Sequence, residues 1–325
     1  MALWRTREST LHAAPKPSPW TSGWHCSTPA RNTLSAADRV LAGPAPAKLN
    51  LVLEVTGRRA DGYHEIDTIL QTLALADTVT LRLDGPPGVS VTGPFARGVP
   101  ADESNLAWGA AKALGRIMGR SVAALGIHLV KRIPAAGGLG GGASDAATVL
   151  RLLAAAWGGV SEDALLEAAM AIGSDEAFLL AGGTARATGR GEAVAPLPDL
   201  PLHGVVLFVP HETIERKTAA MFAALGRLPF EPAGAAGEFV SCPPQRVTGR
   251  DVVNSFERVA FDLFPGLAPL RASIEAVIGE PVRLAGAGPT LFWIGPTDRV
   301  AAVSAAALGL DCAVVATETA GSQWR

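Results

Sequence analysis

Residues 134–147, with the sequence PAAGGLGGGASDAA, decide how the rest of this chain is interpreted. Five of the six residues from 137 to 142 are glycine, and an alanine- and leucine-rich stretch typical of a helix follows. The preceding residues 126–132 (GIHLVKR) alternate in polarity, which predicts a strand. A glycine turn between a strand and a helix brings backbone N–H groups and the positive end of the helix dipole to one point. This arrangement predicts a phosphate-binding loop.

The glycines by themselves fit several kinds of loop. Glycines that serve only packing or flexibility would give the same composition. A P-loop is excluded, because the chain has no Gly-x-x-x-x-Gly-Lys and none of its lysines follows a glycine. The dinucleotide-binding pattern is present as Gly138-x-Gly140-x-x-Ala143, but it requires a second parallel strand after the helix. Residues 161–172 instead begin with a serine cap and have helical spacing, which argues against a Rossmann oxidoreductase.

Further motifs accompany the loop in a fixed order. They are 46–51 (PAKLNL), 57–68 (GRRADGYHEIDT), 173–175 (GSD), 183–192 (GTARATGRGE), 254–257 (NSFE) and 285–292 (AGAGPTLF). Together they resemble the GHMP family of small-molecule kinases, over roughly residues 44–318. The glycine loop and the Gly-Ala-Gly-Pro motif are typical of the whole superfamily. The Asp-Gly-Tyr-His segment is similar to one branch, which phosphorylates a cytidine diphosphate substrate in isoprenoid precursor synthesis.

The resemblance implies an α+β fold of two domains with the active site between them. An N-terminal ATP-binding domain of the ribosomal protein S5 domain 2-like type is expected over 41–198. A ferredoxin-like C-terminal domain is expected over 199–318, and 319–325 form a tail. Local patterns predict strands within 46–91, at 126–132 and from 202, and a hairpin around Gly286. They predict helices at 104–118, 161–172, 213–225, 252–264 and 267–278, and a long mobile loop at 229–245.

Composition limits the classes of partner. The net charge of −2 gives no electrostatic argument for binding nucleic acid or acidic membranes. No apolar run approaches the roughly 20 residues that span a bilayer. The three cysteines lie far apart without metal-type spacing, which indicates a reduced compartment. We therefore expect a cytoplasmic enzyme, monomeric or homodimeric, whose partner is a small molecule.

Residues 1–40 differ from the rest of the chain. They hold five basic and two acidic residues and many Ser, Thr and Pro, without the continuous apolar stretch of a secretory signal. A disordered extension or a start site placed too early accounts for this composition. Plastid targeting by a transit peptide is the alternative.

Two residues are candidates for the chemistry of phosphoryl transfer. Asp175 follows Gly173 and Ser174, so we expect it in the first turn of a short helix capped by Ser174, where the dipole favours an ionised carboxylate. Acids are also common at that position in ordinary helices. Lys48 lies in an apolar strand-like run, where its ammonium must find a partner or face solvent. The resemblance implies that Asp175 accepts the proton of the attacking hydroxyl and that Lys48 pairs with Asp175 and stabilises the alkoxide. Asn50 projects to the same strand face as Lys48 and is implied to bind near that hydroxyl.

The resemblance implies that the loop and two positions outside it contact ATP. These residues are Pro134, Gly137, Gly138, Leu139, Gly140, Gly141, Gly142, Ala143, Ser144, Asn105 and Lys131. We expect Ser144 to cap the loop helix, and the resemblance implies that its hydroxyl approaches Mg²⁺ or the β-phosphate. ATP and Mg²⁺ are thus the expected cofactors. From the sequence alone, Asn105 fits a helix cap and Lys131 a surface charge equally well.

The resemblance also assigns the cytidine site. Tyr63, the only tyrosine of the chain, is implied to stack on the cytosine, and His64 to read its edge by hydrogen bonding. Phe222 is implied to cover the second face of the base, and Gly288 to close over the substrate. A core tyrosine, a structural histidine and a plain hairpin turn would account for the same residues without a substrate.

Two departures from the family pattern leave alternatives open. The family often has serine where this chain has Ala143, and usually Val-Pro where Glu176 and Ala177 follow Asp175. A second carboxylate beside the base would raise the pKa of that base if both point inward. A GHMP kinase of the homoserine or mevalonate type, or an inactive nucleotide-binding protein, therefore remains an alternative to the cytidine diphosphate enzyme.

Overall fold

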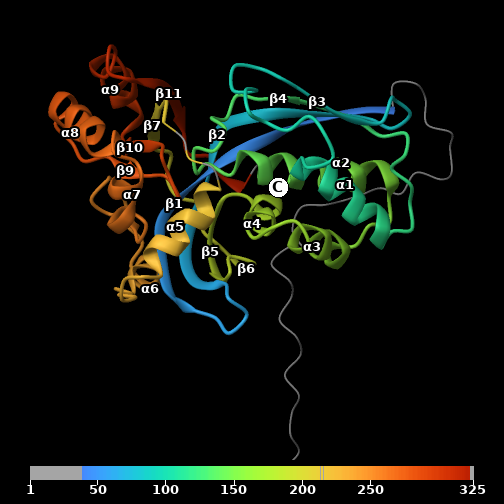
Figure 1. Ribbon diagram of the computed structural model, residues 1–325, viewed down its shortest axis with the longest axis horizontal. Coiled ribbons are helices and arrows are strands. Elements are labelled where there is room, and N and C mark those ends of the chain that lie inside the picture. The colour runs from blue at the N-terminus through green and yellow to red at the C-terminus, as the bar shows by residue number, and fades with distance from the viewer. Residues whose placement is uncertain (1–38, 213, 215, 323–325) are drawn as a thin grey trace, which may run out of the picture.

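The computed structural model describes residues 39–212, 214 and 216–322, which form two β-sheets with helices packed on them (Figure 1). The predictions for residues 1–38 lie outside the described residues. No described helix has the length and apolar character needed to cross a membrane.

The first sheet is built on a long antiparallel pair, β1 (Val40–Arg58) and β2 (His64–Arg82). Beyond one half of β2 lie β4 (Gly126–Val130) and β3 (Gly88–Thr92), and its other half pairs with β5 (Thr184–Gly189). Strand β6 (Ala193–Leu197) extends β5, and the short β8 (Val253–Asn254) runs parallel to β1. The pairing register of β1 shifts at three places, one of them between Pro46 and Lys48. Such irregularities re-aim side chains along a strand.

Four helices accompany this sheet: α1 (Leu106–Ile117), α2 (Gly141–Trp157), α3 (Glu162–Met170) and α4 (Asp175–Ala181). Their buried faces are rich in alanine, and α1 and α2 pack with β2 and β4 in one apolar cluster. The predicted cap of α3 is confirmed, since the Ser161 hydroxyl accepts from the N–H of Ala164.

The second sheet has the strand order β11-β7-β10-β9, and its paired strands are antiparallel. Its strands are β7 (Gly204–Pro210), β9 (Arg283–Leu284), β10 (Leu291–Gly295) and β11 (Cys312–Glu318). The helices on this side are α5 (Lys217–Leu225), α7 (Glu257–Leu263), α8 (Leu267–Ile278) and α9 (Val300–Ala306), with a 3₁₀ turn at Thr297–Arg299 before α9. Helix α6 (Ala235–Ser241) lies against β1 and β2 of the first sheet. The expected ferredoxin-like order is confirmed, because the strands lie in the sequence 4-1-3-2 with helices in both crossovers.

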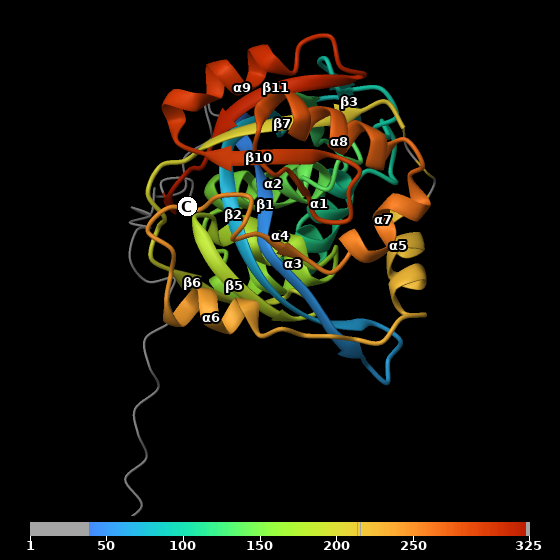
Figure 2. The same cartoon turned by 90° about the vertical axis from the view of Figure 1, so that its left-hand side faces the viewer.

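Alternation along β7 explains how the two sheets meet. Val206 and Phe208 belong to a cluster with α7, α8 and α9, whereas Val205 and Leu207 belong to a cluster with Leu49 and other residues of β1 and β2. Successive side chains of a strand point to opposite faces, so one face of the second sheet packs on helices and the other on the first sheet. Figure 2 shows the strands of the second sheet crossing in front of β1 and β2.

Two predicted elements are wrong, and long-range contacts explain both. The expected helix over 252–264 is present only as α7, because Val253 and Asn254 form β8 and join the first sheet. The expected loop over 229–245 contains α6, because the carboxylate of Glu54 on β1 accepts from the N–H groups of Ala233 and Ala236. A carboxylate at a helix N-terminus satisfies unpaired donors there.

Candidate active site

The glycine loop has the predicted strand–turn–helix form, between β4 and α2. Gly138 and Gly140 have φ values of +85° and +72°. A Cβ at position 138 would overlap the carbonyl oxygen of Ala285, and one at 140 would lie 2.9 Å from Cγ of Lys48. The loop therefore touches both the second sheet and β1, which only glycine permits. The unpaired N–H groups of the first turn of α2 follow directly, so this backbone fits a phosphate group.

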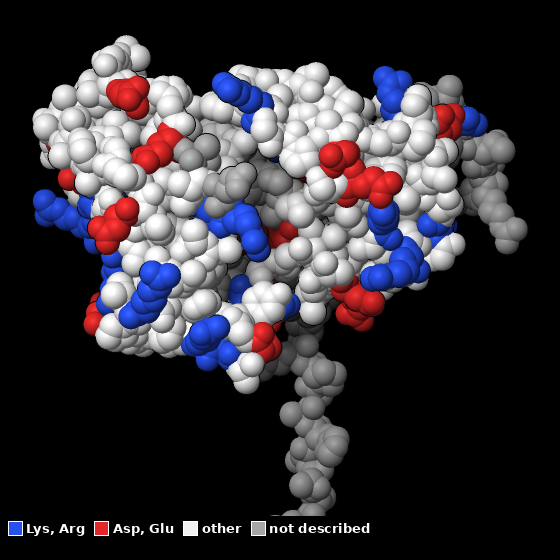
Figure 3. All heavy atoms as spheres, in the orientation of Figure 1, with Lys and Arg blue, Asp and Glu red and all other residues white. Residues whose placement is uncertain are grey.

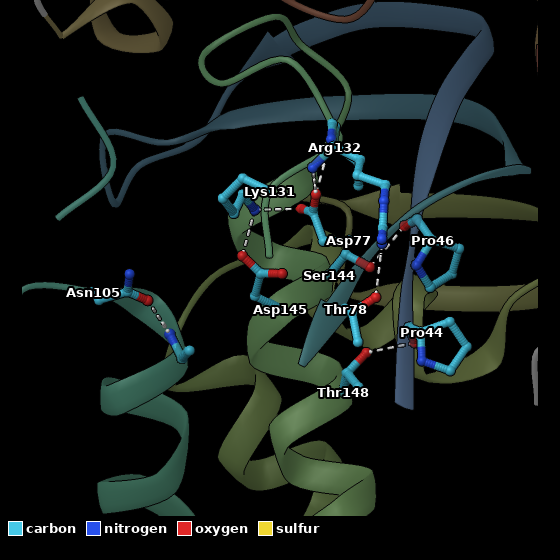
Figure 4. A network of polar contacts seen from close by, with 12 residues as sticks. Pro44, Pro46, Asp77, Thr78, Asn105, Lys131, Arg132, Ser144, Asp145 and Thr148 are labelled. Carbon is cyan, nitrogen blue, oxygen red and sulfur yellow. Dashed lines mark hydrogen bonds and ion pairs between the residues drawn. The ribbon is translucent and has the colours of Figure 1, made fainter. Parts of the chain in front are cut away.

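Ser144 does not cap the helix as predicted. The N-cap is Gly140, and Ser144 lies fully buried inside the first turn. Its hydroxyl donates to the carbonyl of Pro46 over 2.7 Å, and Thr148, one turn later, donates to the carbonyl of Pro44 (Figure 4). The prediction failed because the helix begins at Gly141, three residues before Ser144. Through its hydrogen bond to Pro46, Ser144 links α2 to β1.

Lys131 is not a surface charge. Its ammonium is buried between the carboxylates of Asp77 and Asp145, at 2.5 Å from the latter (Figure 4). The other oxygen of Asp77 accepts the N–H groups of Arg132 and Ile133, at 2.5 and 2.8 Å. Burial raises the pKa of Asp145 to about 7, against the opposing charge of Lys131 and with a further increase from Asp77. This ion-pair cluster joins β2 and the residue after β4 to the N-terminal part of α2.

Asn105 is a helix cap in the structure. Its side-chain oxygen accepts from the N–H of Ala107 at 2.9 Å, and its amide donates to the carbonyl of Pro100. Both polar ends of the side chain are thus used locally. Contact with a nucleotide stays a prediction for Asn105.

Lys48 and Asp175 come together as predicted. The ammonium of Lys48 lies 3.3 Å from the carboxylate of Asp175 and donates to Oδ1 of Asn50 at 2.9 Å. The amide of Asn50 donates to Thr68, which fixes its orientation. The Lys48 side chain is 6% exposed and that of Asp175 is 39% exposed. A buried cation thus holds a carboxylate that solvent or a substrate can reach.

The residues around Asp175 show where the carboxyl group of neighbouring Glu176 points. Ser174 is the N-cap of α4 but its side chain makes no capping hydrogen bond, contrary to the prediction. Glu176 is 2% exposed, and a Cβ at Gly173 would lie 2.6 Å from one of its carboxyl oxygens. Burial raises the pKa of Glu176 to about 7, and the charge of Asp175 adds to the increase. The Glu176 carboxyl therefore folds back over Gly173 instead of facing solvent.

The Asp-Gly-Tyr-His segment closes the loop between β1 and β2 and meets α5. The ring of His64 stacks on Phe222 with centroids 4.7 Å apart, and its Nε2 is buried without a hydrogen-bond partner among the described residues. Burial lowers the pKa of His64, and so does the charge of Arg58. Tyr63 is 55% exposed, with the guanidinium of Arg190 4.7 Å from its ring centroid. The exposed ring of Tyr63 suits a flat ligand. The unpaired Nε2 of His64 is buried, so it would reach a ligand only after the imidazole moves.

The turn between β9 and β10 completes the arrangement. The N–H of Ala285 donates to the carbonyl of Thr290 across the turn, and Gly288 has a φ of +70°. Lys217, at the start of α5, donates to the carbonyls of Ala136 in the glycine loop and of Gly288 in this turn. In the orientation of Figure 1, Figure 3 shows the surface hollowed between α4 and α5, with basic and acidic side chains in the hollow.

Sequence reasoning missed three charged residues of this region. Asp77 had a signal, because it is an acid that directly follows the apolar residues 73–76 (LALA), and Asp145 lies inside the glycine-rich segment itself. Lys217 had none, since it follows Arg216 in a polar stretch without a motif. No cluster of three or more potential His, Cys, Asp or Glu metal ligands occurs in the described part of the chain.

Comparisons with known proteins agree with this geometry. Residues 105–183 match the family of the GHMP kinases N terminal domain. The 4-diphosphocytidyl-2-C-methyl-D-erythritol kinase of Paracoccus denitrificans is 39% identical over 251 residues, which cover 76% of this chain and 84% of that protein. A crystal structure of 4-(cytidine 5'-diphospho)-2C-methyl-D-erythritol kinase superposes with a TM-score of 0.67 at 32% identity, covering 86% of this chain and all of that one. Homoserine kinase from Cytophaga hutchinsonii, at 17% identity and a TM-score of 0.62 over 90% of this chain and 98% of that one, shares the fold.

Removal of Asp77 is expected to destabilise the protein. Asp77→Ala deprives a buried ammonium of one partner and leaves two backbone N–H groups without an acceptor, which costs about 3–5 kcal/mol. Urea unfolding at pH 7 measures this loss. Asp84→Ala is the matched control, because it breaks an ion pair with Arg39 that is about half exposed, worth about 0–1 kcal/mol. Equal losses in the two variants would contradict the role of the cluster.

Glu176 is expected to make stability depend on pH. Its folded-state pKa of about 7 lies above the ordinary value of 4.5, so its contribution is complete below about pH 4.5 and is lost as the pH rises through 7. Glu176→Gln stays neutral, and we expect the free energy of unfolding to fall by about 2–3 kcal/mol less than in the unmodified protein between pH 5 and pH 8. Urea titrations at both pH values test this. Exposed Glu167→Gln serves as the control, and identical pH slopes in all three proteins would refute the assignment.

Proposed function

The chain belongs to the GHMP kinases and, within them, to the 4-diphosphocytidyl-2-C-methyl-D-erythritol kinases, and we propose that it transfers a phosphoryl group from ATP to the 2-hydroxyl of 4-diphosphocytidyl-2-C-methyl-D-erythritol. One observation carries the proposal beyond family membership. The Lys48–Asp175 pair lies against the glycine loop, because Gly140 abuts the Lys48 side chain. A proton acceptor and a phosphate cradle thus occupy one place.

Phosphoryl transfer depends mainly on positioning and on neutralising charge. The backbone of the glycine loop and the start of α2 hold the nucleotide phosphates. Asp175, accessible and held by Lys48, accepts the proton of the attacking hydroxyl. Lys48 stabilises the negative charge that develops on that oxygen, while Asn50 orients the ammonium.

Mg²⁺ fits this site as a companion of the nucleotide. The described residues offer no carboxylate cluster that would hold the ion without ATP, and the Ser144 hydroxyl is engaged with Pro46. Asp175 is the accessible carboxylate next to the loop. When bound through the phosphates, Mg²⁺ supplies neutralisation of their charge.

The cytidine end of the substrate lies at the Asp-Gly-Tyr-His segment in this proposal. The exposed ring of Tyr63 stacks on the cytosine. His64 bonds to the edge of the base after its ring turns to expose Nε2, which is buried in the structure. Phe222 was expected to cover the second face of the base, but in the structure its ring stacks on the imidazole of His64 instead. A homoserine- or mevalonate-type substrate has no base for these groups to recognise, which favours the cytidine compound.

Asp175 provides the first test. We expect Asp175→Asn to lower kcat by about 10²- to 10⁴-fold, the usual contribution of a general base, with little change in ATP affinity. ADP release with ATP, Mg²⁺ and the cytidine substrate measures turnover. Asp163→Asn, an exposed acid in the first turn of α3, is the matched control and should keep full activity. ATP binding without any turnover by the unaltered protein would indicate an inactive nucleotide-binding protein or another substrate.

Tyr63 tests the assignment of the base. Tyr63→Ala should raise KM for the cytidine substrate by about 10- to 100-fold, because one stacked base contributes about 1–3 kcal/mol. KM for ATP should stay unchanged, and Tyr63→Phe, which keeps the ring, should behave like the original protein. Steady-state kinetics with each substrate varied in turn separate the two constants. A parallel rise in both KM values would contradict a base-stacking role.

A further inference from the structure

Lys217, the first residue of α5, contacts both the glycine loop and the turn between β9 and β10. It opens α5, is 8% exposed, and its ammonium donates to the carbonyl of Ala136 at 2.7 Å and to that of Gly288. Ala136 belongs to the glycine loop and Gly288 to the β9–β10 turn. Lys217 therefore lies where the phosphate cradle meets the second sheet.

The charge of Lys217 is not balanced by a carboxylate. No acidic group forms an ion pair with it in the part of the chain that the structure describes, and only carbonyl dipoles face its ammonium. Its burial, together with the positive charge of nearby Lys48, lowers its pKa to about 8. Asp175 pairs with Lys48 and not with Lys217. Among the described residues, the positive charge of Lys217 therefore has no acidic partner beside the glycine loop.

A second donor at the same junction also lacks a partner. The hydroxyl of Thr290 is buried without a hydrogen bond to any described residue, and a Cβ at Gly137 would lie 2.6 Å from it. Burying a charged or polar group without compensation is costly, so such a junction is suited to an anion. A phosphate oxygen bonds an ammonium more strongly than a carbonyl does, because both partners are charged.

We propose that Lys217 binds the terminal, transferred phosphoryl group of ATP and neutralises its charge during transfer. The proposal rests on the proposed function for the identity of the nucleotide. The terminal group is favoured over the inner phosphates because the turn that Lys217 contacts also reaches the partner of Lys48. A Cβ at Gly286 of this turn would lie 3.3 Å from Oδ1 of Asn50, which accepts from Lys48 beside Asp175. On binding, the ammonium exchanges a backbone carbonyl for a phosphate oxygen, and Lys48 remains with Asp175 and the hydroxyl.

The test compares ATP with ADP, which lacks the terminal group, in the absence of the cytidine substrate. Isothermal titration with each nucleotide and Mg²⁺ is carried out on the full chain and on Lys217→Met. We expect the variant to lose about 10- to 100-fold in affinity for ATP, as for one bond to a charged group, and less than about twofold for ADP. Lys217→Arg keeps the charge and should retain most of the preference for ATP.

Kinetics supply a second readout. Lys217→Met should lower kcat and raise KM for ATP, while KM for the cytidine substrate stays unchanged. Lys112→Met removes an exposed lysine that pairs with Glu103 and should alter none of these values. Where Lys217→Met fails to fold, Lys217→Gln replaces it, because the amide still donates to the two carbonyls without a charge.

Two results would overturn the proposal. Equal losses of affinity for ATP and ADP would make Lys217 a structural link between the two loops. Unchanged affinities for both nucleotides, with a raised KM for the cytidine substrate, would instead place Lys217 at the diphosphate of that substrate. Because the titrations contain no acceptor, their outcome does not depend on which alcohol the enzyme phosphorylates. Failure of the proposed function would instead appear as absent turnover with intact ATP binding.

Discussion

The site depends first on the buried cluster of Lys131, Asp77 and Asp145. One carboxylate binds two backbone N–H groups after β4, the ammonium bridges to the second carboxylate, and that carboxylate lies near the N-terminus of α2. The glycine loop is the short connection between these fixed ends. Its glycines permit positive φ values, but the ion-pair cluster decides where the loop begins and where the helix N-terminus points. Without that anchor, a segment with five glycines among six residues would specify no single conformation.

The second constraint is the contact between the two sheets. Leu207 of β7 and Leu49 of β1 belong to one apolar cluster. Because this packing positions the second sheet on the first, the β9–β10 turn lies against the glycine loop. Gly138 has no room for a side chain because the backbone of that turn passes beside it. The same packing brings Lys217 to the junction. The glycine loop, Asp175 and the Asp-Gly-Tyr-His segment are therefore parts of one assembly, although they come from three separate stretches of sequence.

Local sequence was sufficient to predict the elements whose causes are local. The glycine turn, the Ser161 cap and the β9–β10 hairpin follow from propensity and backbone freedom, and the structure confirms them. Helix α6 was not predicted because Glu54, some 180 residues earlier, supplies its N-terminal acceptor. Lys217 was missed for a similar reason, since its partners are carbonyls of two remote loops. The pairing of Lys48 with Asp175 was expected from the family resemblance, whereas spacing alone left a surface lysine as plausible.

The two departures from the family pattern lie on the inner side of the site. Ala143 packs against the apolar cluster around Phe178, and the Glu176 carboxyl folds over Gly173. Because burial holds the pKa of Glu176 near 7, this carboxyl is mostly neutral in mildly acidic solution and adds no full charge beside the base there. When it is neutral, a buried carboxyl group can occupy the place of an apolar side chain without adding a charge to the interior. The contact between Lys48 and Asp175 is therefore present even though Ala143 and Glu176 depart from the family pattern. This favours an active kinase over an inactive nucleotide-binding protein.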